Sequence, residues 1–149
     1  MLGLAATMIA SPASAVFIVN QPWVRPAQAA QTTEAYMNLT STEGATLVGV
    51  STEAARAATI RAPGNVAIAT TKVALPPKLL VALAPGQYRI VLNQLLRTLK
   101  VGDRVNLTLT IEQDDGSRQD IAVNAEVRLR SPIDDERRAH KHSHTLQPQ

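Results

Sequence analysis

Residues 105–127 read VNLTLTIEQDDGSRQDIAVNAEV, and they decide the fold class of this chain. In both halves of the stretch, apolar residues alternate with polar ones, which puts the apolar side chains on one face of an extended strand. Between the halves, Asp115 and Gly116 form a dipeptide that is typical of a tight turn. The stretch therefore predicts a β-hairpin with one face turned toward a hydrophobic core.

Short segments of the same character precede the hairpin. We expect further strands within residues 15–24, 33–41, 45–52, 57–62, 66–75 and 87–93. Residues 52–58 could form a helical turn. Turn residues recur between the segments at the spacing of an antiparallel β-protein. The pattern predicts an all-β fold, a single antiparallel Greek-key β-sandwich or barrel over about residues 16–128.

The composition sets limits on the core and on the partners. Apolar residues make up 45% of the 149 residues but aromatic residues only 3%, so we expect one domain with an aliphatic core. Few aromatic side chains can stack on bases, and much of the net charge of +3 comes from residues 128–149. We therefore expect no nucleic-acid partner. The absence of cysteine excludes disulfides, thiolate zinc sites and a blue-copper centre.

Residues 1–15, MLGLAATMIASPASA, resemble the later part of a secretory signal peptide. An apolar run is followed by the small residues Ala13 and Ala15, which flank one position, but no basic residue occurs before Arg25. Two explanations are open: the assigned translation start lies too far downstream, or the apolar N-terminus is not processed. We expect a truncated signal peptide, cleavage after Ala15 and export to the periplasm. The run is too short for a stable membrane span.

Candidate catalytic residues are scarce. All three histidines lie within residues 140–144, and the carboxylates lie mainly at turns or near the C-terminus, where solvated carboxylates are ordinary. A Ser-His-Asp arrangement would require the C-terminal residues to fold back on the domain. No glycine-rich phosphate loop is present. We therefore do not expect an enzyme.

The histidines of the C-terminal segment are the candidate metal ligands. His140, His142 and His144 occupy alternate positions, so in an extended chain they project to one side, and neutral imidazoles bind Cu(II), Ni(II) or Zn(II). The alternative is a solvated polar end without a ligand. Residues 129–149 carry mixed charge and few apolar side chains, so we expect a disordered tail.

Three blocks of sequence resemble a known family: QPWVRPA at 21–27, EAYMNLTSTEGATLVGVSTEAA at 34–55 and LAPGQYRIVLNQLLRTLKVGDRVNLTLTIEQDDG at 83–116. Their order and chemistry resemble the PCu(A)C family of periplasmic copper chaperones over most of residues 20–127. The resemblance implies a cupredoxin-like β-sandwich and delivery of Cu(I) toward the copper centre of cytochrome oxidase. It also implies partners among periplasmic copper-delivery or oxidase-assembly proteins.

The copper ligands of that family are a His, a Met and a His-x-Met pair, which suit a soft Cu(I) ion. In this sequence the first His falls at or beside Arg61, and the Met falls at Ala67 or Ala69. The His-x-Met pair falls on Arg89 and Val91. Arginine stays protonated and offers no lone pair, so the resemblance implies a family fold whose Cu(I) site is not retained.

Two functions from different classes follow. The first is a divergent copper-handling protein, with copper bound weakly by the C-terminal histidines or together with a partner. The second is a cupredoxin-like binding module without metal, in which Arg61 and Arg89 meet an anionic group or a periplasmic protein. The metal content after mild purification distinguishes the two.

Overall fold

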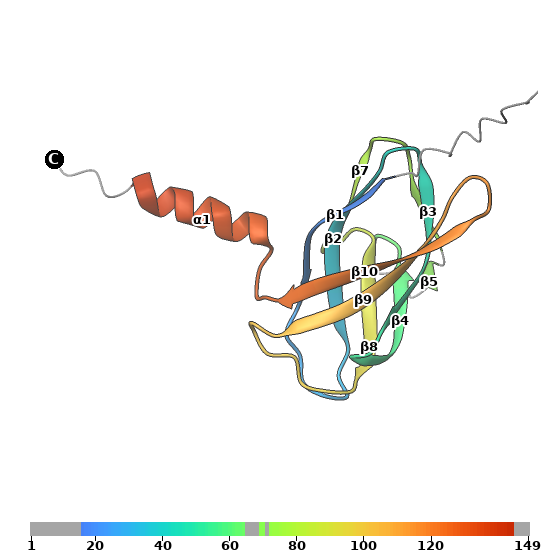
Figure 1. Cartoon of the computed structure of the whole chain (residues 1–149). Helices are drawn as coiled ribbons and strands as arrows, with labels where there is room; N and C mark the ends of the chain where they lie inside the picture. Colours follow the sequence, from blue (N-terminus) through green and yellow to red (C-terminus); the bar gives the residue numbers. More distant parts are fainter. Residues whose placement is uncertain (1–15, 65–68, 71, 145–149) are drawn as a thin grey trace, which may run out of the picture.

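The computed structural model describes residues 16–64, 69–70 and 72–144, in which ten strands and one helix are formed (Figure 1). The elements are β1 (Phe17–Val24), β2 (Thr33–Ser41), β3 (Ala45–Thr52), β4 (Ala55–Arg61), β5 (Ala69–Thr70), β6 (Val73–Leu75), β7 (Leu80–Leu83), β8 (Arg89–Leu95), β9 (Arg104–Glu112), β10 (Arg118–Val127) and α1 (Pro132–His144). The predicted all-β domain is confirmed. The predicted signal peptide, residues 1–15, lies outside the described residues.

The strands form one curled sheet in the order β5-β4-β8-β2-β1-β10-β9-β3-β6, and β7 pairs with the far part of β2. Strand β1 joins the layer of β5, β4, β8 and β2 to the layer of β10, β9, β3 and β6. Its first half pairs with β2, the register shifts between Asn20 and Trp23, and the end of the strand also pairs with β10. Gln21 in this bulge has a φ of 52°. The β1–β10 pair is parallel, which differs from the purely antiparallel sheet that the turn spacing predicted.

The hairpin predicted at residues 105–127 is confirmed as β9 and β10. Strand β9 alternates buried and open positions along its whole length. In the connecting turn, Gly116 has a φ of 85°, a conformation that glycine adopts without strain. The carboxylate of Asp115 accepts hydrogen bonds from the backbone N–H of Ser117 at 2.8 Å and from its hydroxyl. Both bonds favour the ionised carboxylate and lower the pKa of Asp115.

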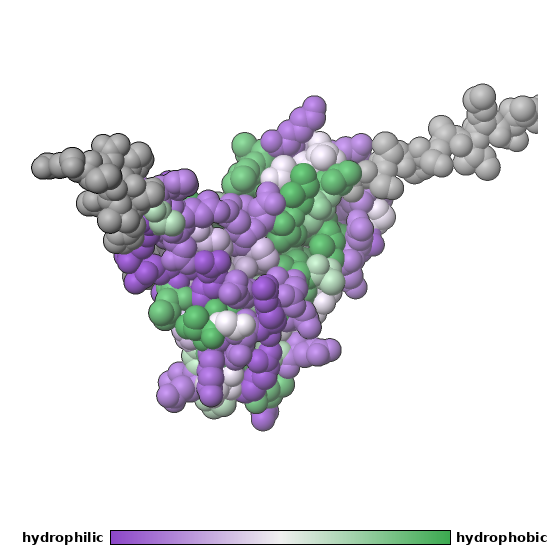
Figure 2. All heavy atoms as spheres, turned by 60° about the vertical axis from the view of Figure 1, so that its left-hand side comes forward, coloured by the Kyte–Doolittle hydropathy of each residue, from purple (hydrophilic) through white to green (hydrophobic). Residues whose placement is uncertain are grey.

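The core between the layers is aliphatic, as the composition indicates. Leu39, Leu109 and Ile90 are fully buried, and burial of such a side chain stabilises the fold by about 1.5–3 kcal/mol. Met37 is also buried in this core. Outside the core, some large apolar side chains stay exposed, among them Ile18 and Leu80, and Figure 2 shows a hydrophobic band on one face.

Two local predictions differ from the structure. Residues 52–58 contain no helical turn: a bend at Glu53 and Ala54 leads directly into β4, which pairs with β8 along its length. Strand β7 was not expected, and it forms because β2 extends beyond β8 and offers a free edge to residues 80–83. In both cases pairing with a distant strand determines the local conformation.

The predicted disordered tail is contradicted over residues 132–144, which form α1. The start of the helix carries its own signals. Ser131 caps it, because its hydroxyl accepts a hydrogen bond from the N–H of Asp134 at 3.1 Å. Pro132 occupies the first helical position, and Asp135 in the first turn forms an ion pair with Arg128. None of the described helices is long and apolar enough to cross a membrane.

Candidate functional site

Three neighbouring strands bring the positions of the implied copper ligands together. Arg61 on β4 pairs with Arg89 on β8, and on its other side Arg61 pairs with Ala69 on β5. Val91 lies two residues along β8, between Thr59 of β4 and Glu34 of β2. The structure therefore places these positions next to each other.

Two parts of the implied ligand set are not described in full. Ala67 lies outside the described residues, and Ala69 is described in its backbone pairing alone. The placement of the implied site therefore rests on Arg61, Arg89 and Val91.

The site lies on the outer face of the sheet. Side chains alternate along a strand, so Arg89 and Val91 point away from the face that carries Ile90 and Leu92. Ile90 and Leu92 belong to the core cluster, whereas the buried Val91 does not. Arg89 is nevertheless well covered, with 14% of its side chain exposed.

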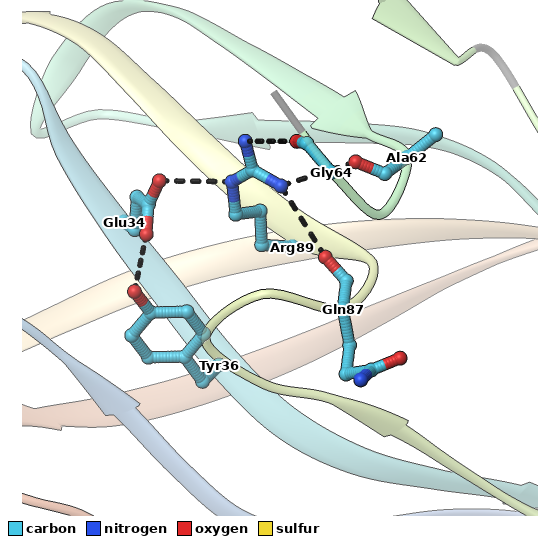
Figure 3. A network of polar contacts seen from close by, with 6 residues as sticks. All are labelled: Glu34, Tyr36, Ala62, Gly64, Gln87 and Arg89. Carbon is cyan, nitrogen blue, oxygen red and sulfur yellow. Dashed lines mark hydrogen bonds and ion pairs between the residues drawn. The ribbon is translucent and has the colours of Figure 1, made fainter. Parts of the chain in front are cut away.

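The Arg89 guanidinium is held by four acceptors (Figure 3). Its Nε donates to Oε1 of Glu34 at 2.9 Å, which forms an ion pair between β8 and β2. Its Nη1 donates to the carbonyl oxygens of Ala62 at 3.1 Å and of Gln87 at 3.4 Å. Its Nη2 reaches the carbonyl of Gly64 at 3.5 Å. The cation thus ties the residues after β4 to the sheet.

Tyr36 extends this network toward β1. Its hydroxyl donates a hydrogen bond to Oε2 of Glu34. Burial, followed by the hydrogen bond and the negative charge of Glu34, raises the pKa of Tyr36 above its ordinary value. The Tyr36 ring packs against Trp23, with the ring centroids 4.7 Å apart and the planes tilted by 44°. The guanidinium carbon of Arg25 lies 5.4 Å from the centroid of the same ring.

This chemistry does not suit a copper ion. The positions implied for a His and for the His-x-Met pair hold Arg61, Arg89 and Val91, and the carboxylate of Glu34 is already engaged by Arg89 and Tyr36. A protonated guanidinium offers no lone pair and repels a cation. Across the described part of the chain, no group of three His, Cys, Asp or Glu residues is arranged to hold a metal ion.

The C-terminal histidines lie on helical backbone rather than on an extended chain. His140, His142 and His144 all belong to α1, and His140 is exposed. A helix turns by about 100° per residue, so alternate positions do not share one side. The extended backbone that the alternate spacing requires is therefore not formed over residues 140–144. Metal capture by the three imidazoles stays a prediction.

Glu34 and Tyr36 are the functional residues that the sequence analysis missed. They stand two apart in the EAYM block, a spacing that puts both on one face of a strand. That spacing was the available signal. Arg89, the partner of Glu34, lies 55 residues away in the sequence, and only the pairing of β2 with β8 brings it near.

Comparison with known proteins covers the whole β-domain. Residues 17–127 match the family of LpqE-like lipoproteins. The apo PCuAC domain from PmoF1 is 26% identical with a TM-score of 0.65, and the alignment covers 76% of this chain and 94% of that domain. Cu(I)-bound DR1885 from Deinococcus radiodurans is 28% identical with a TM-score of 0.53, over 78% of this chain and 81% of that one.

A third relative shares the fold alone. The copper-bound PCuAC domain from PmoF2 is 21% identical with a TM-score of 0.61, and the alignment covers 76% of this chain and 93% of that domain. No protein with a curated description matches the sequence. The resemblance to PCu(A)C domains and the cupredoxin-like fold that it implied are confirmed.

Proposed function

The chain belongs to the LpqE-like family, and from this membership we propose that it is an exported copper-handling protein that does not hold Cu(I) at the family position. The PCuAC fold supports the first half of the proposal, since solved domains of this fold include a copper-bound one. The lipoprotein description of the family and the apolar start of the sequence support export to the periplasm.

One observation carries the second half of the proposal. Arg89 stands where a ligand is implied, and its guanidinium bonds to Glu34 and to backbone carbonyl oxygens on both sides. A fixed cation thus ties β8 to β2 and to the residues after β4. Binding of Cu(I) at this point would require Arg89 to leave its acceptors, and a metal cation beside it would be repelled.

The proposed role is therefore cooperation with other copper proteins rather than storage of the ion. The partners that we propose are periplasmic copper-delivery or cytochrome oxidase assembly proteins, and we propose no catalytic activity. A binding module without metal is the second candidate. Its support is the same network, because Arg89 fills the implied ligand position with bonds to Glu34 and to the carbonyl of Ala62.

Competition for Cu(I) against a coloured chelator tests the proposal. The wild-type chain should leave the chelator loaded. A variant with Arg61→His, Arg89→His, Val91→Met and Ala69→Met restores the implied ligand types and should remove about one equivalent of copper. The matched control is Val91→Met alone, which should behave like the wild type. Stoichiometric uptake of Cu(I) by the wild type would contradict the proposal.

A second titration tests the C-terminal histidines. Cu(II) is added to the wild type and to a variant with His140, His142 and His144 changed to alanine. If the histidines bind the ion, the wild type takes up more Cu(II), and the difference shrinks at lower pH, because protons compete with the metal for the imidazole nitrogens. Equal uptake by both chains would leave the binding module as the better function.

A further inference from the structure

A cleft lies between the outer face of the sheet and the start of α1. Its volume is about 500 Å³, within the range of small-molecule sites. Trp23 of β1 and Ala82 of β7 line the side of the sheet, and Ile133 of α1 lines the side of the helix. The cleft is separate from the Arg89 network, because none of the acceptors of Arg89 lines it. Its walls are mostly apolar, so a ligand with an apolar body would fit.

A strip of mixed side chains leads along the strands to this cleft, since the row next to the cleft holds Asn20, Asn38 and Ala82. Ile18 of β1 and Leu80 of β7 both pair with Thr40 of β2, so the three side chains form one row on the outer face. Ile18 is 40% exposed and Leu80 is 52% exposed. Farther along β7, Ala82 lines the cleft itself. Strand β7 has 4 residues, about 13 Å at ~3.3 Å per residue, so strip and cleft together suit an elongated apolar group.

Two cations stand at the cleft end of the strip. Arg25 and Arg130 both line the cleft, and neither forms an ion pair with any described residue. The contact with the Tyr36 ring, 5.4 Å to its centroid, holds the Arg25 guanidinium in place. Asp134 is the one acidic residue among the lining residues, so the cleft has a net positive charge. The complementary ligand carries a negative charge.

We propose that the cleft binds a single-chain anionic amphiphile, with its carboxylate at Arg25 and Arg130 and its alkyl chain along Trp23, Ala82 and the strip. Each buried methylene contributes about 0.8 kcal/mol, so the chain supplies affinity. The two guanidinium groups supply charge selection, because each can donate paired hydrogen bonds to a carboxylate. This site is independent of copper, and it stands or falls separately from the copper-handling proposal.

The sequence provides a direct probe, because Trp23 is the single tryptophan of the chain. Decanoate is added to the full-length protein below its micelle concentration, and tryptophan fluorescence is followed. We expect a saturable change. Acetate, which has the head group alone, should give none, and decyltrimethylammonium, with the same chain and the opposite charge, should bind at least about tenfold more weakly, which corresponds to about 1.4 kcal/mol.

Variants separate the two parts of the site. Arg25→Gln with Arg130→Gln should weaken decanoate binding at least about tenfold, and Leu80→Gln should weaken it while leaving charge selection intact. Arg118→Gln is the matched control, because Arg118 pairs with Glu112 outside the cleft and is exposed. Thermal unfolding of each variant shows whether it is folded.

Three results would overturn the proposal. They are no saturable change with decanoate, equal binding of the cationic amphiphile, and wild-type affinity in the folded double arginine variant. A fourth measurement uses vesicles of anionic phospholipid. Binding to these vesicles without any binding of monomeric decanoate would make the strip a membrane-contact surface and would also overturn the proposal.

Discussion

Arg89 and Arg25 lie on the same outer face of one sheet, but their surroundings differ. Arg89 is 14% exposed in its side chain and bonds to a carboxylate and to carbonyl oxygens. Arg25 is exposed, touches the Tyr36 ring and makes no ion pair with the described residues. The first arginine is part of the structure, and the second is available to a ligand. The acceptors around Arg89 indicate a structural role for its guanidinium, and their absence around Arg25 among the described residues is what the proposed ligand site requires.

The two regions also differ in how they are held together. Around Arg89, contacts join β2, β8 and the residues after β4, so this region is tied to the sheet of the domain. The wall of the cleft that α1 forms depends on local contacts, namely the Ser131 cap and the ion pair between Arg128 and Asp135. We therefore expect substitutions around Arg89 to change global stability and substitutions at the start of α1 to act locally.

The largest effect is expected for Glu34→Gln. The substitution removes the charge that pairs with the partly buried Arg89, and loss of such a partner costs about 1–3 kcal/mol. Because 32% of the Glu34 side chain is exposed, we expect the lower half of that range. Chemical denaturation measures the change. The control is Glu112→Gln, whose partner Arg118 is 65% exposed against 14% for Arg89, and it should cost less than about 0.5 kcal/mol. Equal losses would show that the Arg89 pair has no special role.

A smaller effect is expected for Tyr36→Phe, which keeps the ring contact with Trp23 and removes one hydrogen bond to Glu34. The loss at neutral pH should be about 1 kcal/mol. The pKa of Tyr36 is raised in the folded state, so the wild type loses stability as the pH rises above about 10, where the unfolded chain releases this proton first. The variant should lack this part of the pH dependence. Parallel curves for both proteins would contradict the assignment.

The smallest global effect is expected for Ser131→Ala at the cap of α1. Loss of a cap costs about 0.5–2 kcal/mol, but here the cost should fall on the helix alone. Hydrogen exchange should show faster opening of α1 with unchanged protection in β9 and β10. Ser117→Ala, which removes the hydroxyl bond to Asp115 in the hairpin turn, is a control for a change of similar size elsewhere. A loss of protection throughout the sheet would show that α1 and the domain unfold together.

Much of the candidate site could be predicted from the sequence. The absence of His and Met from the implied copper positions is a property of residue types, and Arg89 cannot become a ligand in any fold. What could not be predicted is that Arg89 is neutralised by Glu34, since the two residues are 55 positions apart. The helix was missed for a different reason. The low apolar content of residues 129–149 indicates a tail without structure, whereas Ser131, Pro132 and Asp134 carry the capping signal of a helix.

The sequence by itself determined the features that depend on neighbours along the chain. Alternation of apolar residues set the strands, Asp115 and Gly116 set the hairpin turn, and aliphatic composition set the kind of core. Tertiary structure alone decided the parallel pairing of β1 with β10, the ion pair of Arg89 with Glu34, and the cleft between Trp23 and α1. The physical reason is that charge pairing and cleft formation need atoms within a few ångströms, and distance along the chain does not determine that proximity.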